Sequence, residues 1–163
     1  MGCQGSKQLE GDPLTPEMCE TLKKVKFFKD LADEEIKMLS EGFVSISPPA
    51  ENMLVKKGDK GRTYYVIHSG TVTILGDGFE VDLAAPKAFG EIALVKKNPV
   101  REVSVRVGKD GCVLLAMEYE AFNKLCEHEW MREAKRSMFR IANQRRSIMP
   151  KKVYQDMSEK DEE

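Results

Sequence analysis

The stretch FGEIALVKKNPVREVSV, residues 89–105, places a glycine, a carboxylate and an arginine around one tight turn. Gly90 and Glu91 open a short apolar run, a basic turn-forming segment follows, and Arg101 then precedes an alternating run of valines. A carboxylate accepts hydrogen bonds, an arginine binds anions, and the exposed backbone amides at a helix start bind anions too. This combination predicts a pocket for a ligand that carries both hydroxyl groups and a phosphate.

The sequence around this stretch, from residue 53 to residue 117, has the pattern of a β-rich fold. Short β-branched runs such as TYYVIHSG and TVTILGDG are separated by glycines. The spacing predicts strands of about five residues in an antiparallel sandwich or barrel, interrupted by one short helical turn. The tripeptide GDG at residues 76–78 predicts a hairpin turn.

Helical patterns flank the β-rich region on both sides. Pro16 is placed to begin a first helix with Thr15 as its cap. A second helix is expected over residues 33–42, with Asp30 or Asp33 as its cap. After residue 117 an apolar stripe at helical spacing predicts a helix, or a broken pair of helices, that reaches about Ser147.

The overall composition narrows the class of protein. A length of 163 residues fits one domain with tails, and 41% hydrophobic residues are enough to form a core. The 26 basic and 27 acidic residues give a net charge of −1, which provides no general attraction to nucleic acid. No apolar run approaches the roughly 20 residues that span a bilayer. The four cysteines form no C-x-x-C pair, and the two histidines are far apart, so a structural zinc site is disfavoured and free thiols in a reducing cytosol are expected.

The amino terminus, MGCQGS, matches a myristoylation pattern with Gly2 as the acceptor. One myristoyl chain binds membranes only marginally, and Cys3 is placed to take a palmitoyl chain as the second anchor. The alternative is an ordinary disordered start to the chain. We therefore divide the sequence into a flexible acylated leader at residues 1–14, a domain at residues 15–147, and an acidic disordered tail at residues 148–163.

Three stretches together resemble the cyclic-nucleotide-binding domain family, which occurs in protein kinase A regulatory subunits, cyclic-GMP-dependent kinases, gated channels and bacterial transcription regulators. FFKDLADEEIKML is similar to the family's first helices, GDKGRTYYVIHSG to its glycine-spaced hairpin, and FGEIAL followed by an arginine to its phosphate-binding cassette. The resemblance covers about residues 25–145. It implies an α+β fold: an antiparallel β-roll (a double-stranded β-helix, jelly-roll-like) with a short phosphate-cassette helix, flanked by N- and C-terminal helices.

The resemblance also implies roles for individual residues. Gly90 would let the ligand approach the backbone, Glu91 would accept from the ribose 2′-hydroxyl, and Ala93 would offer its backbone N–H. Arg101 would bind the cyclic phosphate, with Ser104 directing its hydroxyl into the pocket. The candidate ligand-binding residues are Gly90, Glu91, Ile92, Ala93, Arg101, Glu102 and Ser104. The structural alternatives are that Glu91 only caps local amides and that Arg101 only neutralises a nearby glutamate.

The sequence departs from the family pattern at two positions. Val100 separates Pro99 from Arg101, whereas in the family the arginine directly follows the proline. Without an insertion Val100 replaces the arginine; with one inserted residue Arg101 and Ser104 regain the family positions, and the valine alternation favours this second alignment. Glu102 stands where the family has a small residue, and it either turns the pocket towards cyclic GMP or weakens cyclic-nucleotide binding altogether.

These observations lead to one main hypothesis and two rivals. The main one is a membrane-tethered, single-domain sensor of cyclic AMP or cyclic GMP on the cytoplasmic face of a membrane, which signals to a protein effector through helix rearrangement. The first rival is an adaptor that binds no ligand, or another purine compound, and recruits a partner to the membrane. The second is an enzyme such as a metal-dependent cupin, which the missing histidine cluster disfavours. We therefore expect no catalytic function, no cofactor other than the regulatory nucleotide, and no nucleic-acid partner.

Overall fold

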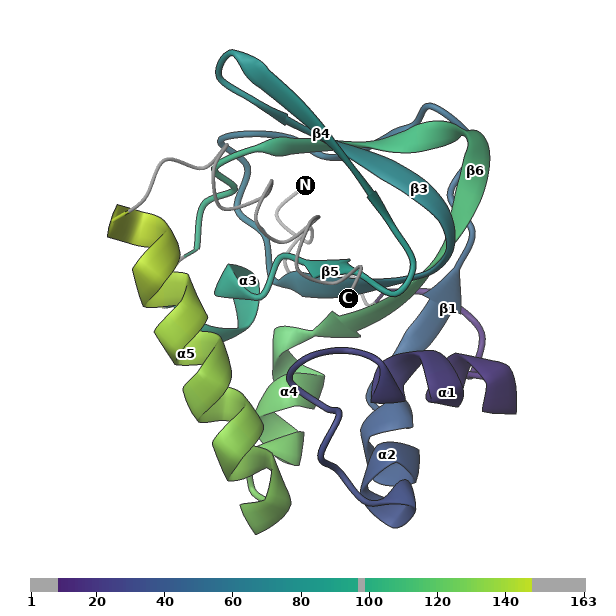
Figure 1. Cartoon of the computed structure of the whole chain (residues 1–163), viewed down its shortest axis with the longest axis vertical. Helices are drawn as coiled ribbons and strands as arrows, with labels where there is room; N and C mark the ends of the chain where they lie inside the picture. Colours follow the sequence, from purple (N-terminus) through teal and green to yellow (C-terminus); the bar gives the residue numbers. More distant parts are fainter. Residues whose placement is uncertain (1–8, 97–98, 148–163) are drawn as a thin grey trace, which may run out of the picture.

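The computed structural model describes residues 9–96 and 99–147 (Figure 1). In chain order its elements are α1 (Pro16–Lys23), α2 (Asp33–Ser40), β1 (Val44–Ile46), β2 (Met53–Val55), β3 (Thr63–Gly76), β4 (Phe79–Ala84), β5 (Ala88–Phe89), α3 (Ile92–Val95), β6 (Ser104–Glu118), α4 (Tyr119–Leu125), the 3-10 turn η2 (Glu129–Met131) and α5 (Arg132–Ser147). The predicted α+β fold, an antiparallel β-roll with N-terminal and C-terminal helices, is confirmed.

The strands form one antiparallel sheet that curls into an open roll. The strand order is β1-β6-β3-β4, with β2 also paired to β6 and β5 to β3. The expectation of strands of about five residues is wrong for β3 and β6, which have 14 and 15 residues. Gly70, which was expected to end a strand, instead lies inside β3 at a bulge with φ of +81°, where the strand bends and stays paired to β6.

The hairpin predicted at residues 76–78 is confirmed. Gly76 and Phe79 are the last paired residues of β3 and β4, so the connection is the two-residue turn Asp77-Gly78. Gly78 has a φ of +76°, a left-handed conformation that glycine adopts without steric cost.

The sequence predicted the cap of the first helix correctly but not the cap of the second. Thr15 caps α1 as predicted, because its hydroxyl accepts from the backbone N–H of Met18 at 3.3 Å. At α2 the expected aspartate cap is wrong. The N-cap is Ala32, whose backbone N–H donates to the Glu35 carboxylate at 2.8 Å, while Asp33 already belongs to the first helical turn. An acidic side chain in that turn interacts favourably with the helix dipole without capping it.

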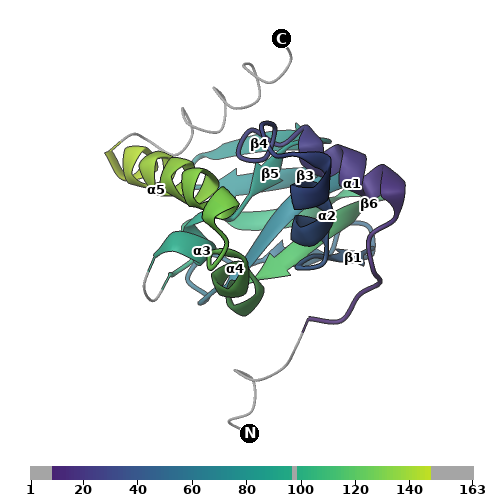
Figure 2. The ribbon, with the colours of Figure 1, turned by 90° about the horizontal axis from the view of Figure 1, so that it is seen from below.

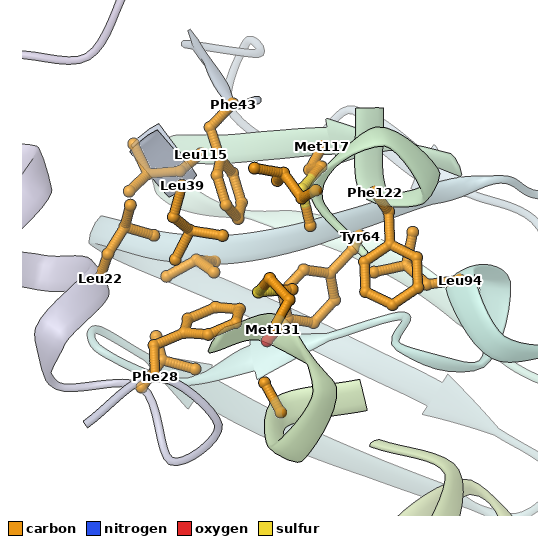
Figure 3. Close-up of a cluster of buried hydrophobic side chains, with 14 of the residues drawn as sticks. Leu22, Phe28, Leu39, Phe43, Tyr64, Leu94, Leu115, Met117, Phe122 and Met131 are labelled. Atoms are coloured by element: carbon orange, nitrogen blue, oxygen red, sulfur yellow. The ribbon is translucent and has the colours of Figure 1, made fainter. Parts of the chain in front are cut away.

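Two hydrophobic cores share the long strands. One lies inside the roll and includes Tyr65, Ile67 and Phe89. The other lies between the roll and the helices, and Figure 3 shows Tyr64 of β3 at its centre, with Phe28 on one side and Phe122 on the other. Because neighbouring residues of a strand point to opposite faces, β3 supplies both cores. Viewed from below, the helices lie in front of the strands that they cover (Figure 2).

Residues 9–14, expected to belong to a flexible leader, are docked on the fold. The Leu9 backbone N–H donates to the Glu118 carboxylate at 3.0 Å. Asp12 and Ser45 of β1 exchange two backbone hydrogen bonds of 3.0 and 2.7 Å. The acylation residues Gly2 and Cys3 and the acidic tail lie outside the described residues. No helix formed by the described residues is long and apolar enough to cross a bilayer.

Candidate functional site

The helix α3 is held against the rest of the protein by its apolar side. Leu94 is 2% exposed and belongs to the core between the roll and the helices, where Figure 3 shows it beside Phe122. In Figure 1, α3 lies between α5 and the roll. At its start Gly90 has a φ of +87°, which turns the chain out of β5 and into the helix. The opposite side of α3 is thereby directed towards the interior of the roll.

A small cavity opens at this side of α3. Its volume is about 40 Å³, room for a few water molecules. The residues that line it are Val55, Gly61, Ile74, Phe89, Gly90, Glu91, Ile92, Ala93, Pro99, Val100, Arg101, Glu102, Val103 and Val105. Six of the seven candidate ligand-binding residues are therefore brought together, and Ser104 is not among them. This volume is smaller than the roughly 300–1,000 Å³ that sites for small molecules commonly measure.

Arg101 is half-buried and directed inward. Its Nη2 donates to the backbone carbonyl of Thr63 at 2.9 Å. Its own backbone pairs with the loop before β3, donating to Asp59 O at 2.8 Å and accepting from Gly58 N at 2.9 Å. The neighbouring Val100 is 50% exposed. Both residues line the cavity, but Arg101 is the more buried and its side chain reaches Thr63, which agrees with the alignment that has one inserted residue.

Glu91 forms the wall of the pocket on the α3 side. The residue is 2% exposed, and it lies between Gly90 and the start of the helix. Burying a carboxylate is unfavourable unless polar groups compensate it. A carboxylate in such a place is therefore a candidate for a specific role, which here would be to accept hydrogen bonds inside the pocket.

Two expected contacts are not formed in this structure. The Ala93 N–H, expected to face the ligand, donates to Gly90 O at 3.0 Å and closes the turn. The Ser104 hydroxyl accepts from the Lys57 backbone N–H at 2.9 Å, outside the pocket. The reason is strand alternation: Val103 and Val105 point inward, so Ser104 between them points outward.

Glu102 lies at the rim of the pocket rather than deep within it. Its side chain is 52% exposed, and its Oε1 lies 3.9 Å from the Lys96 Nζ. An ion pair this exposed is weak, so Glu102 keeps its ability to accept hydrogen bonds from a ligand at the rim.

Three residues that the sequence reasoning did not single out complete the pocket's surroundings. Gly61 lines the cavity against Arg101, and its only sequence signal was its place in the glycine-spaced stretch GDKG. Tyr65 stacks on Phe89 with ring centroids 5.1 Å apart. Burial raises the pKa of Tyr65, an effect that the nearby positive charge of Arg101 partly offsets.

The terminal helical segments contain two large apolar side chains, Met138 in α5 and Trp130 in η2. Met138 is fully buried in the core between the roll and the helices. Trp130 is half-buried and stacks on His128 at 5.4 Å. Both therefore have packing roles in this structure. Across residues 9–96 and 99–147, no group of three or more His, Cys, Asp or Glu side chains is arranged to hold a metal ion.

Comparison with known proteins identifies the family. A family model described as the cyclic nucleotide-binding domain matches residues 46–129, which include the pocket and most of the roll. The chain belongs to the cyclic nucleotide-binding domain family. The expectation drawn from the three sequence stretches is thus confirmed.

The relatives that match this cyclic nucleotide-binding domain are longer proteins, and the match covers a part of each. A cGMP-dependent protein kinase of Toxoplasma gondii is 28% identical over 105 residues, which is 64% of this chain and 10% of the kinase. A cAMP-dependent protein kinase regulatory subunit of Yarrowia lipolytica is 28% identical over 99 residues, 60% of this chain and 26% of the subunit. The chain therefore spans a minor part of the length of each.

The fold has a close counterpart among solved structures. The regulatory domain of Toxoplasma gondii PKA, in a co-crystal structure with cAMP, superposes with a TM-score of 0.66 at 20% identity. The superposition covers 77% of this chain and 48% of that chain. At this identity the likeness establishes the fold.

Proposed function

We propose that this domain is a sensor that binds a cyclic nucleotide in the pocket beside α3. The observation that carries the proposal is the meeting of Gly90, Glu91 and Arg101 in one pocket. They supply a close backbone approach, a buried acceptor and a guanidinium. A cyclic nucleotide presents the matching groups: a ribose 2′-hydroxyl that donates and a cyclic phosphate that carries a negative charge.

The guanidinium of Arg101 suits a phosphate. It carries five N–H donors in a planar fork, and Nη2 bonds the Thr63 carbonyl oxygen. A phosphate oxygen would accept a charge-assisted bond from the same group. The Thr63 carbonyl would hold the guanidinium in place while the phosphate binds.

The small volume of the pocket supports a conformational response. A ligand larger than the 40 Å³ cavity binds only when α3 and the roll separate or rearrange. Leu94 ties α3 to the core that also contains Phe122 of α4 and Met138 of α5. A shift of α3 would therefore disturb the packing of both helices, and the ligand would favour whichever arrangement binds it better. The output of the sensor would be the surface of these helices, recognised by a protein effector.

The two candidate ligands, cyclic AMP and cyclic GMP, differ in their base. The relatives named above include both a cGMP-dependent kinase and a cAMP-dependent regulatory subunit. Glu102 at the rim favours guanine, because a carboxylate accepts from the guanine N1 and amino protons. We therefore propose cyclic GMP as the better ligand.

Acylation at Gly2 and Cys3 would attach the sensor to the cytoplasmic face of a membrane. The test is co-expression with an N-myristoyltransferase and a labelled fatty acid. Incorporation of label in the full chain, and its loss in Gly2→Ala, would support the tether. Label that persists in Gly2→Ala would exclude Gly2 as the acceptor.

Calorimetry with cyclic AMP, cyclic GMP and guanosine on the full chain tests the binding function. We expect binding of cyclic nucleotides, with Arg101→Ala and Glu91→Ala each weakening it by about 2–5 kcal/mol. Arg106→Ala is the matched control, because it removes the same charge from β6 outside the pocket. Absence of binding to every compound would reject the sensor and favour the ligand-free adaptor, for which the small cavity is the supporting observation.

A further inference from the structure

We propose that Gly61 is a positioning residue for phosphate recognition, because its missing side chain provides the space in which the Arg101 guanidinium lies. The ligand-dependent part of this proposal rests on the cyclic-nucleotide function proposed above. The packing of the two residues does not depend on it.

The atoms nearest to the space beside Gly61 belong to the Arg101 side chain. A Cβ atom added at Gly61 would overlap the Arg101 Nε and Cζ atoms and come within 2.7 Å of its Nη2. These are the three nearest heavy atoms, and all belong to the guanidinium group. Contacts this short do not occur between real side chains, so an alanine at position 61 requires the guanidinium to move.

Backbone conformation does not explain why position 61 is a glycine. Gly61 is not among the described glycines with a positive φ, so an L-residue can adopt its backbone conformation. Gly90, on the other side of the guanidinium, is different. Its φ is +87°, and an added Cβ would lie 3.0 Å from both the Arg101 Nη1 and the Thr63 carbonyl oxygen. Gly61 is thus required for space alone, whereas Gly90 is required for space and for conformation.

The surroundings of the guanidinium thus fix its position. Gly61 and Gly90 lie against it, and Thr63 O accepts from its Nη2 at 2.9 Å. A planar guanidinium recognises a phosphate through the direction of its N–H groups, so a displaced plane loses phosphate bonds even though the charge remains. None of the three atoms nearest to a Cβ at position 61 belongs to Glu91, so we expect recognition of the sugar to be retained.

A double-mutant cycle in the full chain tests the proposal. The variants are Gly61→Ala, Arg101→Ala and the two together, titrated with cyclic GMP and with guanosine. We expect Gly61→Ala to weaken cyclic GMP binding by about tenfold and to leave any guanosine binding unchanged, because guanosine has no phosphate. In the Arg101→Ala background the same substitution should change the affinity by less than about twofold, since its Cβ no longer meets the guanidinium.

Gly78→Ala is the matched control, in the turn between β3 and β4. Gly78 has a φ of +76°, and a Cβ there meets no atom within 4 Å. Gly78 does not line the pocket beside α3, so this variant should lower the melting temperature and leave cyclic GMP affinity within about twofold of wild type. If Gly78→Ala weakens binding as much as Gly61→Ala, a general loss of stability explains the effect and the proposal is wrong.

Thermal unfolding without ligand tests the packing of Gly61 against Arg101 even if the protein binds no cyclic nucleotide. It therefore distinguishes a failure of this proposal from a failure of the proposed sensor function. Gly61→Ala should lower the melting temperature of the wild type and have little effect in the Arg101→Ala background. Equal effects of Gly61→Ala in both backgrounds, on affinity or on melting temperature, would overturn the inference. If the wild type binds no cyclic nucleotide, phosphate positioning falls with the sensor function, and the unfolding cycle still decides whether Gly61 makes room for Arg101.

Discussion

The Nη2 of Arg101 lies 2.9 Å from the carbonyl oxygen of Thr63, the first residue of β3. This bond joins the segment that follows α3 to the long strand that supplies both cores. It also gives the guanidinium a fixed internal partner, so the direction of its other donors is set before any ligand arrives. A side chain held in this way lowers the ordering cost of binding an anion.

Arg101→Lys tests whether the shape of the guanidinium matters in addition to its charge. Lysine keeps the charge but is a compact ammonium without the planar fork, so it does not reproduce the contacts with Thr63 O and a phosphate together. We expect cyclic-nucleotide affinity to fall, by less than in Arg101→Ala. Calorimetry measures the loss, and Arg106→Lys is the matched control. Wild-type affinity in Arg101→Lys would mean that the pocket needs only a positive charge.

The raised pKa of Tyr65 predicts how the stability of the protein depends on pH in alkaline solution. Burial is the main cause that raises its pKa above the usual 10.0 in the folded protein. A group whose pKa is higher in the folded than in the unfolded state contributes stability that is complete below the unfolded pKa and is lost as the pH rises above it. The wild type should therefore lose stability above about pH 10. Tyr65→Phe, which keeps a ring to stack on Phe89, should lose less, and parallel melting curves for the two proteins across this range would contradict the assignment.

The sequence predicted the order of elements well because each has a local signal. The Thr15 cap, the Asp77-Gly78 turn and the valines of β6 are read from neighbouring residues alone. At Gly70 the neighbouring residues alone do not predict the structure. A glycine between two β-branched runs is compatible with a turn or with a bulge, and the pairing of β3 with the distant β6 decides in favour of the bulge.

The sequence likewise predicted some residues of the pocket and missed others. Gly90, Glu91 and Arg101, singled out from the sequence, do share the pocket, and the inward position of Arg101 agrees with the alignment that has one inserted residue. The valine alternation places Ser104 outside, which the family position had obscured. Gly61 had no chemical signal of its own, since its importance appears only when the Arg101 side chain lies against it.

The burial of Leu94 predicts that the packing of α3 contributes to the stability of the whole protein. The side chain is 2% exposed in the core shared with α4 and α5. Leu94→Ala should destabilise the protein by about 2–5 kcal/mol, because it removes a buried side chain and leaves a cavity. Leu94→Met keeps most of the volume and should cost less than about 1.5 kcal/mol. Denaturant unfolding gives both values, and equal losses for the two variants would show that the volume at this position is unimportant.

The docking of residues 9–14 on β1 leads to a prediction about the start of the chain. Asp12 and Ser45 exchange two backbone hydrogen bonds, and Gly11 lies so close to β1 that an added Cβ would be 2.6 Å from Ser45 O. Gly11→Ala should therefore push this segment away from the sheet and break both bonds. Asp12→Ala is the matched control, because the Asp12 side chain is exposed and only its backbone takes part.

Amide hydrogen exchange is the direct measurement of this docking. In the wild type and in Asp12→Ala the amides of residue 12 and Ser45 should be protected, because each donates to the other residue. In Gly11→Ala both should exchange faster, while amides inside β3 keep their protection. If the Asp12 amide of the wild type exchanges as fast as that of an unstructured peptide, residues 9–14 are not docked in solution.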